Sequence, residues 1–389
     1  MFTKKLLNVA LCASLGAAAA FSATAADFKA VEVSASKQQA ASFSFPLYQS
    51  ETLNFAAEGQ TTASDEYWFT VSGAELNKGV LLNTTQPGAL VRISRNEATS
   101  SPLKTDSIML NGQDSVNAVE QVFSEKDLEA VGIFNNSAAL RVNASVAAGD
   151  LTLRYADKLA ADELYTVNVK EKNSDKKLML NTAKLSYLSA EKLSFAAAIE
   201  TGDSALALNS AKGIIVSPSG KVYNVDVNIG ANGEATVNRA DINKIEAPVN
   251  GLYELRIDAT ASDNGLTVRR TGKVAFGLAK ATASIADVVA TSAKGAPKAT
   301  VNVDVQQAGR YEVRAVLLGT DTNGNLKPVM ETHAANWLKP GAQSISVPFD
   351  RAILAKSGLK APFAVQHVQL RDQGNMSSLD KVVEAVSVK

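Results

Sequence analysis

Apolar and polar residues alternate along most of this chain, in short runs. Alternation with a period of two places one face of a β-strand in a core and the other in water. Clear examples are YTVNVKEK (165–172), KVYNVDVNIG (221–230), ATVNVDVQQ (299–307) and QSISVPFD (343–350). The pattern predicts a protein built mainly of half-buried strands.

Turn sequences separate these runs. They include NSDKK at 173, SPSGK at 217, SDNG at 262, TNGN at 322 and KPG at 339. Asn-Gly and Pro-Gly pairs supply the backbone angles that tight turns need. Because closely spaced strands and turns are typical of sandwiches and barrels, we expect an all-β fold of consecutive immunoglobulin-like β-sandwich domains.

Helical patterns are confined to two short segments. SEKDLEAVG (124–132) has Ser124 as a potential N-cap, Asp127 three residues later and Gly132 as a terminator. DRAILAKSG (350–358) has the same form, with Asp350 as the cap. These signals predict one or two short crossover helices between strands.

One phrase occurs three times: AGDLTLR (148–154), NGLYELR (250–256) and AGRYEVR (308–314). In sandwiches a strand often enters from a turn through glycine, and a tyrosine near its start packs inward at the corner. Gly251 with Tyr253 and Gly309 with Tyr311 fit such a structural corner. The alternative is that the phrase marks any strand after any turn.

The unequal intervals between these phrases exclude a fixed-period repeat, so one phrase per domain is the simplest interpretation. We expect an N-terminal β domain over 26–160, an immunoglobulin-like sandwich over 161–280 and a C-terminal sandwich over 281–389. The joints YADKLAADELY and GLAKATASI are short and poor in Gly and Pro. Such joints favour domains that pack against each other.

The first residues have the form of a secretory signal peptide. Lys4 and Lys5 precede an alanine-rich apolar run, and Ala23 and Ala25 provide a small-x-small cleavage site. We therefore expect residues 1–25 to be removed and the mature protein to be periplasmic or extracellular. Lipidation at Cys12 is disfavoured because a large residue, Leu, precedes it.

Charge and cysteine content narrow the class of protein further. The 39 basic residues balance 39 acidic ones, which gives no indication of nucleic acid or of an anionic membrane as partner. The single cysteine lies in the predicted signal peptide, so no disulfide or thiolate metal site is expected in the mature chain. No later segment reaches the ~20 apolar residues of a membrane-spanning helix.

Motifs for catalysis or metal binding are absent from the sequence pattern. His333 and His367 are the two histidines, and neither accompanies a Gly-x-Ser-x-Gly nucleophile motif or zinc-ligand spacing. DTNGN, from Asp321, resembles half of a calcium loop but lacks the later glycine and acid, so a hairpin turn explains it better. We expect no catalytic residue, metal or cofactor; paired carboxylates from distant strands leave no motif and stay open.

Two clusters allow more than one interpretation. Arg269, Arg270 and Lys273 lie in one predicted strand, where a solvated edge is preferred over contact with a neighbouring domain's carboxylate. In YWF, Tyr67 and Phe69 are expected to face the core, which turns Trp68 outward. Trp68 is then covered by a loop or another domain, or is a platform for a flat ligand such as a sugar ring, or the inward face is wrongly assigned.

Longer stretches resemble known exported proteins. VSPSGKVYNVDVNIG, followed by APVNGLYELRIDATASDNGLTVRRTGKVAFGL, resembles the immunoglobulin-like modules of exported bacterial proteins. DEYWFTVSGAELNKGVLLNTTQPGALVRIS (65–94), with FAVQHVQLRDQGNMSSL (363–379), resembles an uncharacterised family of exported three-domain β proteins from Gram-negative bacteria. The resemblance implies the architecture and brings no catalytic residues.

The preferred function is a non-enzymatic exported binding or interaction module for a protein or glycan. The alternative is a hydrolase or the accessory fragment of a secreted hydrolase. Fold alone does not decide between them, because sandwiches host both. The ligand and the oligomeric state are left open by the sequence.

Overall fold

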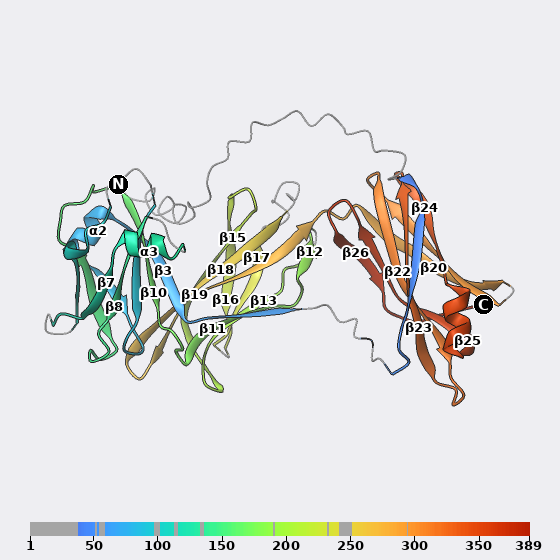
Figure 1. The fold of residues 1–389 in the computed structure, drawn as a ribbon, viewed down its shortest axis with the longest axis horizontal. Helices are drawn as coiled ribbons and strands as arrows, with labels where there is room; N and C mark the ends of the chain where they lie inside the picture. The colour runs from blue at the N-terminus through green and yellow to red at the C-terminus, as the bar shows by residue number, and fades with distance from the viewer. Residues whose placement is uncertain are drawn as a thin grey trace.

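The fold was analysed in a computed structural model that describes residues 38–50, 53, 59–96, 102–112, 116–132, 136–189, 191–231, 233–240, 251–293 and 295–389. The predicted signal peptide and Cys12 lie outside these residues. Three groups of strands follow one another along the long axis of the molecule (Figure 1). The expected all-β fold of sandwich-like domains is confirmed.

The first group of strands, called unit 1, has two sheets. One has the order β3-β10-β5-β8-β7 and the other the order β4-β9-β6. The strands are β3 (Glu66–Ser72), β4 (Val80–Asn83), β5 (Leu90–Arg95), β6 (Ile108–Asn111), β7 (Val119–Phe123), β8 (Ser137–Val142), β9 (Asp150–Tyr155) and β10 (Leu164–Lys170). Buried residues alternate with exposed ones along β9, so its apolar side chains join one core with Tyr67 and Val71.

The middle group, unit 2, is one sheet among the described residues, with the order β12-β19-β18-β15-β16-β17-β13-β11-β2, and β14 pairs with β13. The hydroxyls of Thr62 and Ser64 in β2 donate hydrogen bonds to carbonyls of β19. β2, at one edge of the sheet, therefore lies beside β19, which is next to the other edge, and the sheet closes around a core. The strands are β2 (Gln60–Ser64), β11 (Lys176–Thr182), β12 (Ser186–Leu188), β13 (Phe195–Thr201), β14 (Ser204–Leu206), β15 (Leu208–Val216), β16 (Val222–Ile229), β17 (Ala235–Ala240), β18 (Leu252–Asp263) and β19 (Leu266–Ala279).

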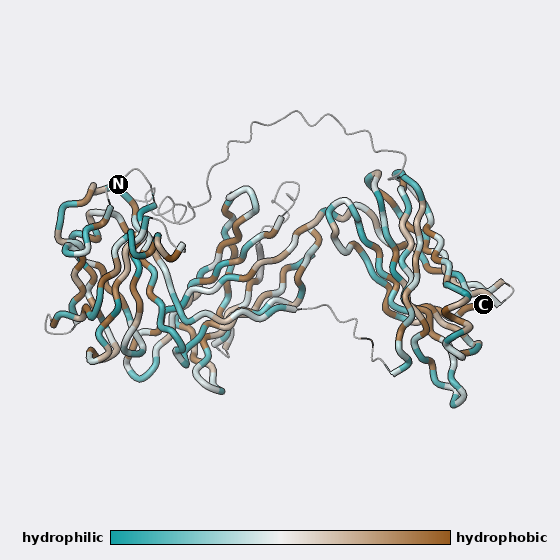
Figure 2. The backbone as a smooth tube through the Cα atoms, viewed as in Figure 1, coloured by the Kyte–Doolittle hydropathy of each residue, from teal (hydrophilic) through white to brown (hydrophobic). Residues whose placement is uncertain are grey.

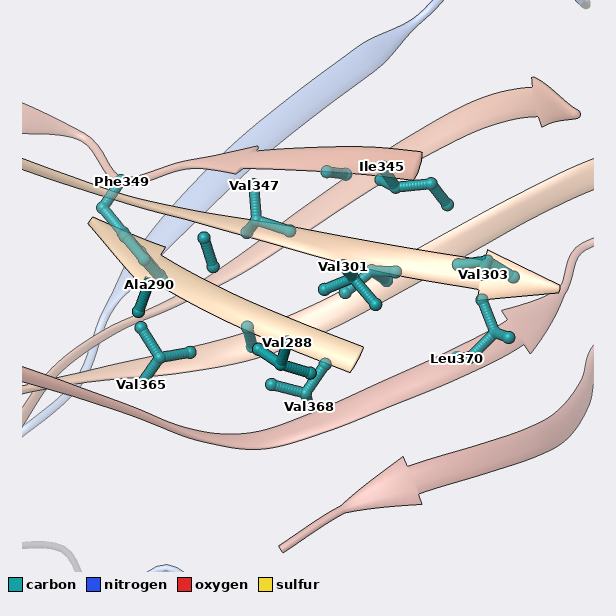
Figure 3. Close-up of a cluster of buried hydrophobic side chains, with 14 of the residues drawn as sticks. Val288, Ala290, Val301, Val303, Ile345, Val347, Phe349, Val365, Val368 and Leu370 are labelled. Atoms are coloured by element: carbon teal, nitrogen blue, oxygen red, sulfur yellow. The ribbon is translucent and has the colours of Figure 1, made fainter. Parts of the chain in front are cut away.

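The C-terminal group, unit 3, packs the sheet β1-β23-β22-β25-β26, with β27 beside β25, against the sheet β20-β21-β24. Figure 3 shows valines of β20, β21, β24 and β25 meeting in the core between them. The strands are β1 (Ala41–Pro46), β20 (Ala283–Ala293), β21 (Ala296–Val305), β22 (Gly309–Thr320), β23 (Leu326–Leu338), β24 (Gly341–Pro348), β25 (Lys360–Asp372), β26 (Ser377–Val382) and β27 (Val386–Ser387).

The chain does not visit the three units in simple order. β1 pairs with β23 of unit 3, with Ala41 opposite Ala335, and β2 belongs to unit 2 (Figure 1). The expected N-terminal domain over 26–160 therefore contains strands of all three units, and β10 of unit 1 begins after residue 160. The physical reason is that the backbone of a strand can pair with any sheet edge that it reaches, however distant that edge is in sequence. The expected division at residue 280 lies between β19 and β20.

Among the described residues, two of the three short helices begin and end as the sequence predicts. α3 (Glu125–Ala130) is capped by Ser124, whose side chain accepts a hydrogen bond from the Asp127 amide. α4 (Arg351–Ser357) is capped by Asp350 and ends at Gly358, which has a φ of 70°. α2 (Gly73–Lys78) was not expected, although Ser72 and Glu75 form a capping box there. The described residues also include a 3-10 turn, η2 (Thr105–Ser107).

Hydropathy follows this architecture: brown, hydrophobic stretches gather inside each unit, while teal ones are common in its turns (Figure 2). None of the helices in the described part of the chain is long and apolar enough to cross a bilayer.

Candidate functional site

Units 1 and 2 are joined by a buried ion pair. Arg270 of β19 and Glu171, which directly follows β10, both have fully buried side chains, and Arg270 Nη2 lies 2.5 Å from Glu171 Oε2. The Glu171 carboxylate also accepts hydrogen bonds from the backbone amides of Thr85 and Gln86 and from the Thr85 hydroxyl. The pair therefore links a loop of unit 1 to a strand of unit 2.

This contact corrects one expectation. The solvated edge preferred for the arginine cluster is wrong for Arg270, and the alternative contact with a neighbouring carboxylate is confirmed. The Arg270 Nε also donates to the carbonyl of Lys176, at 2.8 Å, and Nη2 lies 3.1 Å from the Ser174 hydroxyl. Several donors of one guanidinium are thus used, which is the arrangement that allows a buried charge.

A cleft of about 820 Å³ lies where β3 of unit 1 approaches unit 2. Trp68, Phe69 and Thr70 line it from β3, and β15, β16, β18 and β19 provide the remaining lining. The charged and hydroxyl side chains that unit 2 contributes are Lys212, Asp226, Arg256, Asp258, Arg269 and Thr271. Three cationic and two acidic side chains therefore surround one concave space.

Trp68 is only partly exposed and lines this cleft. Its backbone amide lies 3.4 Å from the Thr271 hydroxyl, so unit 2 covers part of the strand that carries it. Tyr67 and Val71 are buried in the core of unit 1 as expected, whereas Phe69 is partly buried and also borders the cleft. Trp68 thus has features of both the covered and the platform interpretations.

Arg269 stacks on aromatic rings of unit 1. Its guanidinium carbon lies 4.6 Å from the centre of the Phe69 ring and 5.1 Å from that of Tyr67. Such cation–π contacts hold the guanidinium plane while leaving its edges available for hydrogen bonds. Arg269 thus presents an oriented cation at the wall of the cleft.

Asp258 lies among these cations. The Thr271 hydroxyl donates to its carboxylate at 2.5 Å, and Lys212 is its cross-strand neighbour on β15. Burial raises the pKa of the Asp258 carboxyl, against the opposing effects of the Thr271 hydrogen bond and of Arg269, Arg256 and Lys212. The cleft therefore contains a carboxyl group that is costly to ionise beside fixed positive charge.

The predicted corner residues lie away from the cleft. Tyr253 and Tyr311 are fully buried near the starts of β18 and β22, and they belong to the separate cores of units 2 and 3. The Tyr311 hydroxyl donates to the carbonyl of Gln307 at 2.6 Å. Gly251 has a φ of 130°, and a Cβ there would lie 2.9 Å from Pro218, whereas a Cβ at Gly309 would only touch the Tyr311 ring.

The two histidines have structural surroundings. His333 lies 2.6 Å from Glu312 and 3.0 Å from Glu331, and its ring stacks on Phe43 of β1. His367 has a φ of 54° where the pairing of β25 with β22 is irregular, and burial, then Lys381, lowers its pKa. Both ring nitrogens of His333 thus face carboxylates, and neither histidine borders the cleft.

The DTNGN segment forms a turn. The Asp321 carboxylate accepts hydrogen bonds from the amides of Asn323 and Asn325, and Gly324 has a φ of 84°. Within the described ranges no group of three His, Cys, Asp or Glu residues is arranged to hold a metal ion. The hairpin interpretation of this segment is confirmed.

Only part of this site could be predicted from the sequence. The position of Trp68 on the outer face follows from strand alternation. Apart from Phe69 and Thr70, its neighbours on β3, the members of the cleft come from four strands of unit 2, and no local motif marks them. The adjacent arginines at 269 and 270 were the one signal that could have pointed to the junction of the units.

Comparisons with known proteins identify relatives of this chain. The family model of the DUF4785 N-terminal domain, a domain of unknown function, matches residues 32–171, and that of the DUF4785 C-terminal domain matches residues 282–389. No curated protein matches. The solved structure of a DUF4785 family protein from Legionella pneumophila is 20% identical with a TM-score of 0.70, over 90% of this chain and 93% of that chain, which shows a shared fold.

Other solved structures are much less similar. A DUF3823 family protein from Bacteroides ovatus is 13% identical with a TM-score of 0.20, over 49% of this chain and 95% of that chain. The chicken CNTN1 FN1-FN3 domains are 11% identical with a TM-score of 0.21, over 80% and 98% of the two chains. The predicted resemblance to an uncharacterised family of bacterial β proteins is confirmed, and because the two matched segments span more than half of its length, this chain belongs to the DUF4785 family.

Proposed function

We propose that this chain is an exported, non-enzymatic binding protein that holds a glycan in the cleft between units 1 and 2. The observation that carries the proposal is the position of Trp68, which borders a cleft of about 820 Å³ together with side chains able to bond hydroxyl groups. Export is proposed from the signal-like residues 1–25.

The dimensions and lining of the cleft support a glycan. Binding sites for small molecules commonly have volumes of roughly 300–1,000 Å³ and combine aromatic side chains with a few polar ones. Trp68 offers an indole face to the apolar side of a sugar ring, while Asn224, Asn228 and Thr70 offer amide and hydroxyl groups to its substituents. A concave space of this size suits a small ligand better than a protein partner, since a stable protein interface buries about 800 Å² on each side.

A hydrolase remains the second candidate for one specific reason. Asp226 and Asp258 both border the cleft, and a carboxyl group whose pKa is raised, as in Asp258, suits a general acid. Binding alone is preferred because Asp258 is engaged by Thr271 and faces three cations. Cleavage of a glycan by the wild type that is lost in Asp258→Asn would establish the hydrolase.

The test compares glycan binding by the wild type, by Trp68→Ala and by Trp337→Ala, which removes the other tryptophan of the chain, located in unit 3. An array would select the ligands, calorimetry would measure affinity, and a reducing-sugar assay on the same samples would measure the release of reducing ends. Trp68→Ala should weaken binding by about tenfold or more, since the ligand would bury the exposed face of the indole and complete burial of a large side chain contributes about 1.5–3 kcal/mol. Equal binding by Trp68→Ala and the wild type would contradict the proposal.

A further inference from the structure

We infer that the cleft selects an acidic glycan, in which a sugar carboxylate binds to Arg269 and Lys212 while the sugar ring lies against Trp68. This inference rests on the proposed function and names the ligand class of the same site. It follows from the charges that border the cleft: Lys212, Arg256 and Arg269 are cationic, and Asp226 and Asp258 are acidic.

Arg269 is oriented for such a ligand. Its guanidinium is held by the rings of Phe69 and Tyr67, and its side chain makes no hydrogen bond or ion pair with the described residues. Arginine binds carboxylates through two parallel hydrogen bonds, and a guanidinium fixed in advance loses little freedom when it does so. An oriented guanidinium at the wall of a cleft is therefore prepared for an external anion.

Lys212 provides a second available cation. It is exposed on β15, lies opposite Asp258 across the strand pair, and likewise makes no hydrogen bond or ion pair in the described part of the chain. Arg256 differs, because its Nε is bonded to Glu254 at 2.5 Å. Two of the three cations are thus open to a ligand, and the third is already neutralised.

The two acidic residues of the cleft form no close ion pair with Lys212 or Arg269 among the described residues, although Asp258 interacts with both electrostatically. The Asp258 carboxylate is occupied by the Thr271 hydroxyl and forms no ion pair with Lys212 or Arg269. Asp226 is an exposed residue of β16, which lies one strand further from Arg269 than β15, the strand of Lys212. A ligand carboxylate would therefore find two cationic donors, Arg269 and Lys212, without a close counter-ion among the described residues of the cleft that Trp68 borders.

The experiment measures binding of the full chain to oligogalacturonates and to the same oligosaccharides after carboxyl reduction, which keeps the ring and removes the charge. Lys212→Gln and Arg269→Gln should each weaken binding of the acidic form by about 10- to 100-fold, the range of a hydrogen bond between charged groups. Lys177→Gln, an exposed lysine on β11, is the matched control and should bind as the wild type does. Lys212 is exposed, so Lys212→Gln should leave the fold intact. It therefore tests the inference even if Arg269→Gln, which removes a stacking contact, disturbs the fold.

The outcomes separate the inference from the function on which it rests. Equal affinity for the acidic and reduced forms, with binding lost in Trp68→Ala, would overturn the acidic specificity and retain the glycan site. No binding of either form, or binding unaffected by Trp68→Ala, would overturn both. Preference for sulfated neutral oligosaccharides in a parallel measurement would overturn the carboxylate assignment.

Discussion

Replacement of Arg270 by methionine should lower the free energy of unfolding at the junction of units 1 and 2. The substitution preserves much of the side-chain volume but leaves the Glu171 carboxylate fully buried without its counter-charge. Three donors, the amides of Thr85 and Gln86 and the Thr85 hydroxyl, still bind that carboxylate, so it has hydrogen bonds without a cation. Removing one partner of a buried pair costs about 3–5 kcal/mol, and we expect a loss in this range.

Urea unfolding followed by fluorescence would measure the loss. The chain has two tryptophans, so a Trp337→Phe background leaves Trp68 of unit 1 as the reporter, and a Trp68→Phe background leaves Trp337 of unit 3. Following each unit separately is necessary because several domains need not unfold in one step. Only the unfolding transition reported by Trp68 should shift to a lower urea concentration.

Two further variants make the result specific to the ion pair. Arg270→Met combined with Glu171→Gln removes the uncompensated charge and should recover a large part of the lost stability. Lys273→Met removes an exposed cation of the same strand, 3.6 Å from Glu254, and should cost less than about 1 kcal/mol. A loss below about 1 kcal/mol for Arg270→Met, or an equal shift of both transitions, would show that the ion pair does not stabilise the junction of units 1 and 2.

Three other predictions concern different parts of the chain. Tyr253→Ala and Tyr311→Ala should each destabilise their own unit by about 3–5 kcal/mol in urea unfolding, because both rings are fully buried, and a loss below about 1 kcal/mol would contradict the corner assignment. Because the pKa of Asp258 is raised in the folded state, its protonated form stabilises the fold below the unfolded value of 3.8, and this contribution is lost as pH rises through the folded pKa. Asp258→Asn should thus melt above the wild type at neutral pH, with the difference shrinking toward pH 3.8, and a constant difference in thermal scans would contradict this. Mass spectrometry of the exported protein should find an unlipidated N-terminus at Ala26 or Asp27, whereas acylated Cys12 would overturn the signal-peptide assignment.

The fold was predictable where local chemistry determines it. Period-two alternation predicted the strands, and Ser124 and Asp350 predicted the starts of two helices. The capping box of Ser72 and Glu75 predicts the third helix equally well, but the apolar alternation of YWFTV before it suggested a continuing strand. Local signals therefore predicted most elements, but they missed a helix that directly follows a strand.

Long-range pairing was not predictable in this way. β1 joins β23, and the Ser44 and Thr332 hydroxyls that meet there are 288 residues apart. A strand of six residues offers the same backbone donors and acceptors to any sheet edge, so its sequence carries little information about its partner. The expected range of 26–160 for the first domain therefore carried no information about the pairing of β1 with β23.

The candidate site was only partly predictable for a related reason. Alternation turned Trp68 outward, but its surroundings depend on how units 1 and 2 meet. Arg270 resembled a solvated cation because its partner, Glu171, lies 99 residues away and only the fold brings the two together. Burial of a charge is a property of the assembled pair and not of either residue's neighbours in sequence.

Trp68 should contact a glycan in the cleft between units 1 and 2. Fluorescence titration of the Trp337→Phe variant with oligogalacturonates would detect this contact, because Trp68 is then the single tryptophan of the chain. We expect a saturable change in Trp68 emission that is absent with carboxyl-reduced oligosaccharides and absent from the Trp68→Phe variant, in which Trp337 alone emits. Saturable binding by calorimetry without any change in Trp68 emission would show instead that the ligand binds elsewhere.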